Sequence, residues 1–216
     1  DAQVKETIRD LFPLGPSHNP ANLMGIEVAE EFFPHSPQVA VFDTAFHQTM
    51  PPKAYLYAVP REWYTQYRLR RYGFHGTSHK YIARETANFL GKPLAETNII
   101  SIHLGNGCSM AAIRNGKCVD TTMGVTPLEG LVMGTRSGDI DPAALEYIME
   151  QTGMDIHQML NALNKQSGLK GLCGVNDMRE VVERTAKGNE QAETALQIFC
   201  YRIQKYIGAY MAVVKN

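Results

Sequence analysis

Residues 103–142 combine small, polar and cationic side chains in a pattern that suits ligand binding better than core packing. Gly105 and Gly107 flank an asparagine at the start of this stretch, and Gly134 and Gly138 lie on either side of Arg136 near its end. Glycine lets the backbone approach a ligand closely and present its N–H groups. The guanidinium of Arg136 is planar, charged and suited to phosphate or carboxylate. These residue types predict a site for an oxyanion, and a phosphoryl group fits them best.

Two other parts of the chain carry side chains that could take part in such chemistry. Asp43 follows a short apolar run, where it could act as a catalytic carboxylate or serve as a turn residue or helix cap. His75 and His79 lie four residues apart and raise the alternative of a zinc site. However, Gly76 favours a loop at this point, and no His-Glu-x-x-His motif surrounds the pair. The pattern therefore favours phosphate chemistry over zinc.

These residues need secondary-structure elements to position them, and the clearest elements begin near residue 98. Residues 98–103, 109–114 and 117–121 are typical of strands, and glycine-containing turns separate them. The second turn is Asn115-Gly116, a pair that accepts the positive φ angles of a type I′ turn. The sequence therefore predicts an antiparallel meander. Further strands are expected at residues 39–42 and 54–59, and helices at 4–12, 21–33, 61–67, 79–90, 142–151, 156–165, 178–187 and from about 189 to the end.

Composition excludes several other classes of protein. The 216 residues are 44% hydrophobic and 20% charged, which is typical of a globular protein with an ample core. A net charge of -1 gives no reason to expect a nucleic-acid partner, and no apolar run is long enough for a membrane span. The four cysteines form no CxxC pair, and no signal peptide is recognisable, so we expect reduced thiols and a cytoplasmic location. Because the chain opens without methionine and closes inside a helical pattern, we expect an internal piece of a longer protein.

Five segments, read together and in order, carry a resemblance to a known family. They are residues 17–23, 41–49, 71–79, 103–107 and 120–142. In their types and spacing they resemble the acetate/propionate kinase family, and the resemblance runs through nearly all of the chain. It implies an α/β fold of the actin-like ATPase and sugar-kinase (ribonuclease H-like) architecture, in a partial two-domain chain. Residues 1–45 would be the C-terminal part of the first domain, on the acyl-substrate side, and residues 46–216 most of the second, nucleotide-binding domain.

The resemblance also implies a reaction and a set of site residues. The reaction is reversible, Mg²⁺-dependent transfer of the ATP γ-phosphate to acetate, giving acetyl phosphate and ADP. The resemblance also implies a homodimer and a short-chain carboxylate as the substrate. Asp43, His75 and Arg136 match the family's catalytic residues, and no metal ligand falls within this chain. Nucleotide contacts are implied for His103, Leu104, Gly105, Asn106, Gly107, Asp177, Met178 and Arg179, and the acyl pocket is implied for Ser17, Phe74 and Pro127.

Some features depart from the family pattern and leave alternatives open. Ser17 stands where members usually carry leucine, which could enlarge the acyl pocket and favour propionate. Residues 171–179 are one residue shorter than the usual pattern. The family's N-terminal phosphate loop, substrate arginine and C-terminal glycine-rich segment with its glutamate are not in this sequence, so the chain alone is not expected to turn over. Other short-chain acyl kinases, a pyrophosphate-dependent or sugar-phosphorylating relative, and a non-catalytic nucleotide-binding module remain alternatives.

Overall fold

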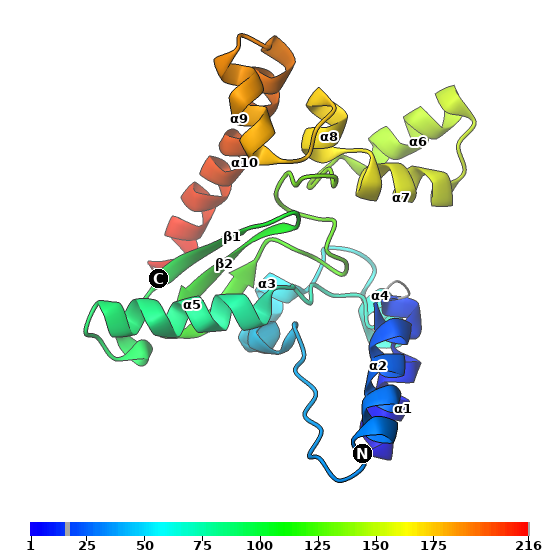
Figure 1. The fold of residues 1–216 in the computed structure, drawn as a ribbon, viewed down its shortest axis with the longest axis vertical. Helices are drawn as coiled ribbons and strands as arrows, with labels where there is room; N and C mark the ends of the chain where they lie inside the picture. Colours follow the sequence, from blue (N-terminus) through cyan, green and yellow to red (C-terminus); the bar gives the residue numbers. More distant parts are fainter. Residues whose placement is uncertain (16–17, 216) are drawn as a thin grey trace. The chain divides into compact units, whose positions relative to one another are not determined.

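The computed structural model describes residues 1–15 and 18–215, in two compact units that meet in sequence at Phe42 and Asp43. The first unit contains the helices α1 (Ala2–Asp10) and α2 (Asn19–Phe32), which pack against each other (Figure 1). An ion pair of 2.6 Å between Lys5 and Glu30 joins them. Both helices were predicted, and each begins two residues earlier than expected.

The strand predicted at residues 39–42 is wrong. These residues form no secondary structure, and the side chains of Val39 and Val41 are 82% and 74% exposed. A short apolar run becomes a strand only where a neighbouring strand takes up its hydrogen bonds. No strand in the described ranges pairs with it.

The second unit is built on a meander of three antiparallel strands in the order β1-β2-β3. Its strands are β1 (Ile99–Leu104), β2 (Cys108–Arg114) and β3 (Lys117–Thr121), with Leu104 opposite Cys108 at the first turn. At the second turn, Asn115 and Gly116 have φ angles of 51° and 72°, as a type I′ turn requires. The predicted meander is therefore confirmed, and its first turn carries residues 105–107 of the expected phosphate loop.

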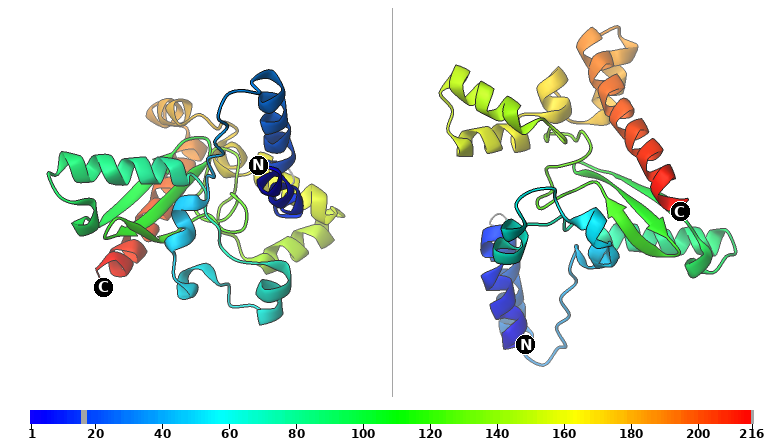
Figure 2. Two further views of the ribbon diagram at one scale, coloured as in Figure 1. Left: turned by 90° about the horizontal axis from the view of Figure 1, so that it is seen from below. Right: turned by 180° about the vertical axis from the view of Figure 1, so that it is seen from behind.

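Helices cover both faces of this sheet. The helix α10 (Glu190–Val214) lies on one face and α5 (Gly76–Phe89) on the other, as Figure 2 shows from two directions. The central strand β2 is buried from Cys108 to Ile113, because alternate side chains face alternate helices. Met110 and Ala112 pack in the cluster that includes Phe199 of α10, whereas Ala111 and Ile113 pack in the cluster that includes Ala83 of α5.

Shorter helices complete the second unit, and two of them differ from expectation. They are α3 (Pro52–Tyr55), α4 (Arg61–Tyr67), α6 (Pro142–Thr152), α7 (Ile156–Lys165), α8 (Gly168–Cys173) and α9 (Met178–Ala186). The strand expected at residues 54–59 is wrong, since Pro52 starts a helix there, a position that proline favours. The helix α8 was not predicted from the sequence.

Two further observations concern membrane-spanning helices and the cysteines. No helix among residues 1–15 and 18–215 combines the length and apolarity needed to cross a membrane. The four cysteines are free thiols in the structure; Cys108, Cys118 and Cys173 are buried and Cys200 is exposed.

Candidate active site

His75 is held in an uncommon backbone conformation by Asp43. Its φ and ψ angles are 58° and 25°, in the left-handed region that few non-glycine residues adopt. The backbone N–H of His75 donates to Oδ2 of Asp43 at 2.6 Å, and that of Gly76 donates to the Asp43 carbonyl at 2.8 Å. A Cβ atom on Gly76 would lie 2.2 Å from that carbonyl oxygen, so only glycine fits. Asp43 therefore fixes the turn that presents the His75 ring at the start of α5.

Arg136 and His75 converge on Gly107, at the first turn of the meander. A Cβ atom on Gly107 would lie 3.2 Å from Nη1 of Arg136 and 3.4 Å from Nε2 of His75. The same Nη1 donates to the carbonyl of Pro127 at 3.1 Å, which anchors the guanidinium. Burial lowers the pKa of Arg136, but the ordinary value lies so far above neutral pH that the group stays charged. The structure thus places a fixed cation and an imidazole side by side, at a position kept open by glycine.

The loop that carries Arg136 is fixed by the helix α8. The backbone N–H groups of Leu169 and Lys170, in the first turn of α8, donate to the carbonyls of Met133 and Gly134 at 2.9 and 3.0 Å. These N–H groups would otherwise lack partners within the helix. A Cβ atom on Gly168, whose φ angle is 62°, would lie 2.1 Å from the Met133 carbonyl oxygen. The loop and the helix therefore touch backbone to backbone.

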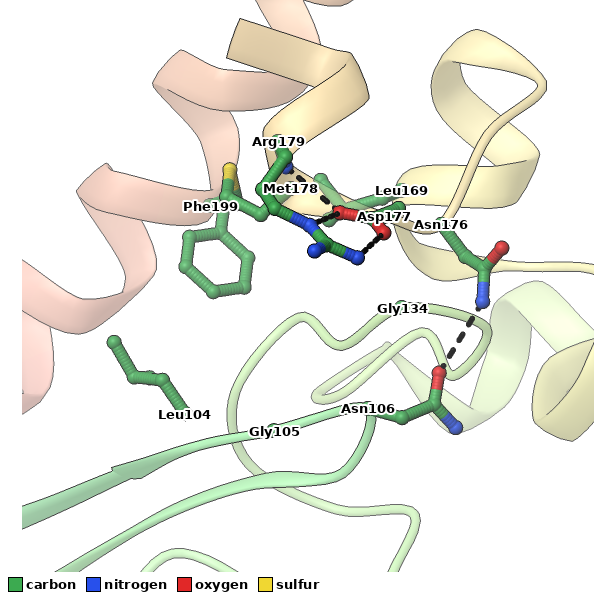
Figure 3. Close-up of a pocket in the computed structure, with 10 residues that line it drawn as sticks. All are labelled: Leu104, Gly105, Asn106, Gly134, Leu169, Asn176, Asp177, Met178, Arg179 and Phe199. Carbon is green, nitrogen blue, oxygen red and sulfur yellow. Dashed lines mark hydrogen bonds and ion pairs between the residues drawn. The ribbon is translucent and has the colours of Figure 1, made fainter.

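A cavity of about 450 Å³ opens beside this loop (Figure 3). Asn106 lies on one side of it, and Oδ1 of Asn106 accepts a hydrogen bond of 3.4 Å from Asn176 (Figure 3). The backbone carbonyl of Asn106 also accepts from the N–H of Gly134 at 3.2 Å. The walls mix apolar and polar groups, as small-molecule sites do. The cavity is lined by Leu104, Gly105, Asn106, Gly134, Leu169, Asn176, Asp177, Met178, Arg179 and Phe199.

Asp177 and Arg179, expected to contact a nucleotide, are paired with each other across the top of this cavity. Asp177 caps the helix α9 by accepting from the backbone N–H of Arg179 at 2.9 Å, and it also forms an ion pair of 2.6 Å with the Arg179 side chain. Hydrogen bonds from Arg179 lower the pKa of Asp177 to about 2. Asp177 is thus at least a helix cap, while the Arg179 side chain is 91% exposed and accessible to a ligand.

Four histidines surround the start of α5, more than the sequence interpretation used. The ring of His103 stacks on that of His75, with centroids 4.1 Å apart. His47, which the sequence interpretation overlooked, is fully buried and donates from Nε2 to the Phe74 carbonyl at 2.8 Å. Burial, followed by the neighbouring His103 and opposed by Asp43, lowers the pKa of His75 to about 4. His75 is therefore a neutral imidazole at pH 7.

The geometry gives the His75 and His79 pair a role other than zinc binding. Nδ1 of His75 and Nε2 of His79 both lie within hydrogen-bonding distance of the Ser109 hydroxyl, at 2.9 and 2.8 Å. Within the described ranges, no group of three or more histidine, cysteine, aspartate or glutamate side chains could hold a metal ion.

The residues expected in the acyl pocket are only partly described. Ser17 lies outside the described residues. Phe74 is half-buried against the core of the second unit, and its carbonyl is the one that accepts from His47. Pro127 is half-buried and accepts from Arg136 through its carbonyl. Phe74 and Pro127 are therefore attached to the site through their backbone carbonyls.

A partly buried ion pair that the sequence did not indicate supports the segment before Arg136. Arg71 donates to the carbonyls of Thr122 and Met123 at 3.0 and 3.1 Å, and it pairs with Glu129. Tyr57 donates its hydroxyl to the same carboxylate. Hydrogen bonds that satisfy both members of a partly buried ion pair fix its geometry. This cluster holds residues 122–129, which precede the loop of Arg136.

The buried His79 makes stability depend on pH. Burial lowers the pKa of His79 to about 3, below the unfolded value of 6.5, so the unfolded state binds more protons between these values. Stability is therefore fully present above pH 6.5 and is lost as the pH falls. At pH 4.5 we expect this ring to reduce the free energy of unfolding by about 3 kcal/mol. Urea unfolding at pH 7 and 4.5 measures this loss of stability, and the loss should be smaller in His79→Gln. An equal loss between the two pH values in the variant and the wild type would contradict the assignment to His79.

Comparisons with known proteins now identify what the chain is similar to. The family model described as "Acetokinase family" matches residues 1–216. A protein named acetate kinase from Nitratidesulfovibrio vulgaris is 64% identical over 214 residues, which are 99% of this chain and 53% of that protein. One from Oleidesulfovibrio alaskensis has the same identity and coverage. The chain thus spans about half the length of the curated relatives it matches.

Solved structures agree with the predicted architecture. An acetate kinase from Porphyromonas gingivalis superimposes with a TM-score of 0.96 at 46% identity, over 100% of this chain and 54% of that one. A propionate kinase from Francisella tularensis superimposes with a TM-score of 0.95 at 50% identity, over 99% of this chain and 55% of that one. These matches confirm the predicted α/β fold of the actin-like class.

Proposed function

Since the chain belongs to the acetokinase family, we propose that it forms the central part of an acetate kinase. In this proposal the enzyme transfers the γ-phosphoryl group of ATP to the carboxylate of acetate, and the reaction is reversible. The observation that carries the proposal is the convergence of Arg136 and His75 on the glycine turn at Gly107. A fixed cation and a hydrogen-bond donor beside an open glycine turn are what a transferring phosphoryl group requires.

Each of the three proposed catalytic residues has a distinct part in this transfer. The transition state spreads negative charge over three equatorial oxygens, so positioning and charge compensation matter most. Arg136 supplies charge through a guanidinium already anchored on Pro127. His75 is neutral at pH 7, so it donates a hydrogen bond to the phosphoryl group and does not transfer its proton. Asp43 holds the His75 backbone through Oδ2, and the residue itself is exposed.

Mg²⁺ fits this arrangement through Asp43. Mg²⁺ prefers oxygen ligands and usually takes one or two carboxylates together with phosphate oxygens, so a single exposed carboxylate suits it. When bound, it would neutralise charge on the phosphate oxygens. Asp43 would orient it through its water shell.

The nucleotide is proposed to occupy the cavity between the glycine turn and the start of α9. Asn106 and Gly134 lie on its phosphate side, and Met178 and Phe199 give it an apolar wall suited to a base. On this proposal residues 46–216 belong to the nucleotide-binding domain and residues 1–45 to the domain on the acyl side. The homodimer expected for the full-length enzyme is likewise a proposal, which sedimentation equilibrium tests.

A propionate kinase is the second candidate, because the propionate kinase from Francisella tularensis is among the similar structures. Ser17, in place of a leucine, favours the same substrate. One methylene in an apolar pocket changes discrimination by roughly 1–3 kcal/mol, so a comparison of the two acids separates the candidates.

The full-length enzyme, incubated with ATP, Mg²⁺ and acetate, is expected to form an acyl phosphate that hydroxylamine traps as a hydroxamate. A panel of C1 to C4 acids gives the relative kcat/KM for each acid, and higher values for propionate than acetate would favour the second candidate. Replacing ATP with pyrophosphate tests the alternative donor. Absence of hydroxamate with every acid and both donors would contradict an acyl kinase.

A further inference from the structure

A chain of hydrogen bonds runs from the interior of the second unit to the His75 ring. It begins at Ser101 of β1, whose hydroxyl lies 2.9 Å from Nδ1 of His79. Nε2 of His79 lies 2.8 Å from the hydroxyl of Ser109 on β2, and that hydroxyl lies 2.9 Å from Nδ1 of His75. Ser109 and His79 are fully buried, and Ser101 is 3% exposed. Water therefore cannot readily replace any bond inside the chain.

The direction of the hydrogens in this chain decides which nitrogen of His75 carries its proton. A neutral histidine has one N–H donor and one acceptor nitrogen, and a serine hydroxyl has one hydrogen to donate. In one direction, Ser101 donates to His79, His79 donates to Ser109, and Ser109 donates to Nδ1 of His75. Every buried hydrogen then has a partner, and the proton of His75 is on Nε2.

The opposite direction leaves a hydrogen without a partner. His75 would donate from Nδ1 to Ser109, Ser109 to His79, and His79 to the Ser101 oxygen. The Ser101 hydrogen would then have no acceptor among its hydrogen-bond partners in the described ranges. An unpaired buried donor is costly, so the first direction is favoured.

A third arrangement, with His75 protonated on both nitrogens, meets the same obstacle at Ser109. If its hydroxyl accepts from both histidines, its own hydrogen loses its partner in a fully buried position. If it donates to His79 instead, the Ser101 hydrogen is again left without an acceptor. The chain therefore also disfavours the imidazolium form of His75. The charged and titratable groups that face His75 are Asp43, His47, His79, His103 and Arg136; of these, Asp43 alone favours the charged form, and the chain opposes it together with burial.

We propose that Ser109 and His79 are positioning residues that fix His75 as the neutral imidazole with its proton on Nε2. That nitrogen is the one near Gly107 and Arg136, where the phosphoryl group is proposed to lie. His75 then always presents an N–H donor to a phosphoryl oxygen. It never presents an acceptor lone pair, which would repel the oxygen. Hydrogen bonds from neighbouring groups to the other ring nitrogen fix the tautomer of metal-bound histidines in the same way. The catalytic part of this inference rests on the proposed function, whereas the tautomer does not.

Nuclear magnetic resonance of the full-length protein, labelled with ¹⁵N in histidine, tests the tautomer without turnover. Long-range ¹H–¹⁵N spectra distinguish an N–H nitrogen from an acceptor nitrogen, and His75→Gln assigns the signal. At pH 7 we expect His75 to carry its proton on Nε2. A proton on Nδ1, or on both nitrogens, overturns the proposal. A protein with the expected tautomer but no acyl kinase activity would refute the proposed function and leave the inference intact.

Variants then test the effect on catalysis. For Ser109→Ala we expect a mixture of His75 tautomers, and we expect the acid limb of the pH profile of kcat to move towards pH 6.5. The value of kcat should fall about 10- to 100-fold, while KM for ATP and for acetate stays unchanged. His79→Gln keeps an amide N–H for Ser109 and should retain the tautomer and most of kcat. Thr97→Val removes another buried hydroxyl, bonded to the Pro93 carbonyl, and should change none of these readouts. An unchanged tautomer and kcat in Ser109→Ala overturns the proposal.

Discussion

Replacement of Arg136 with lysine is expected to lower kcat of the full-length enzyme by about 100- to 1,000-fold while KM for ATP changes little. Nη1 of Arg136 donates to the Pro127 carbonyl at 3.1 Å and also lies beside Gly107. A guanidinium can hold this anchor with one N–H and present its other donors to a phosphoryl oxygen, because its fork is planar and rigid. A lysine ammonium has the charge but would have to give up one of the two tasks.

The control for this prediction is a lysine substitution at an arginine far from the glycine turn. Arg84 lies on the exposed surface of α5 with its side chain 63% exposed and paired with Glu85, so Arg84→Lys should leave kcat unchanged. Initial rates in the hydroxamate assay, with ATP and acetate varied separately, give kcat and the KM for each substrate. A variant of Arg136 with wild-type kcat would remove the guanidinium from the transition state.

The fold was predicted best where short-range signals and tertiary contacts agree. Asn115-Gly116 specifies its turn by backbone conformation alone, so the strands on either side of it were located almost to the residue. The apolar residues 39–42 and 54–59 gave no such signal, because a short apolar run does not determine its own partner. The helix α8 was missed for a related reason. It is short, contains glycines, and owes its position to the loop carrying Arg136, which is distant in sequence.

Some residues of the candidate site were likewise recognisable from the sequence, and others were not. Arg136, Gly107 and the glycines around them were recognisable by type, because few structural roles need a cation between glycines. Ser109 was not recognisable, since a serine in a strand looks like any small polar residue. Its meaning arises only when the strand β2 and the helix α5 bring it between two histidines. The roles of Asp43 and His75 came from resemblance, and the residues alone left both open.

Substitution of Gly168 by alanine is expected to be among the most damaging changes outside the residues that would touch the phosphoryl group. The φ angle of 62° costs a residue with a side chain about 1–2 kcal/mol. In addition, a Cβ atom here would lie 2.1 Å from the Met133 carbonyl oxygen and 2.7 Å from that of Arg136. Both are backbone atoms that cannot rotate away, so the loop must move. We expect a total loss of about 2–5 kcal/mol in the free energy of unfolding.

Gly153→Ala provides the matched comparison that separates the two causes. Gly153 also has a positive φ angle, 72°, but a Cβ atom there would meet nothing within 4 Å. In Gly153→Ala the free energy of unfolding should therefore fall only by the backbone strain of about 1–2 kcal/mol. Urea unfolding of both full-length variants measures the two losses. Gly168→Ala should also lower kcat under conditions where the protein remains folded, because a shift of about 1 Å in the Arg136 loop can reduce the rate about 100-fold. Equal losses of stability in the two variants, with kcat unchanged in both, would mean that α8 does not position Arg136.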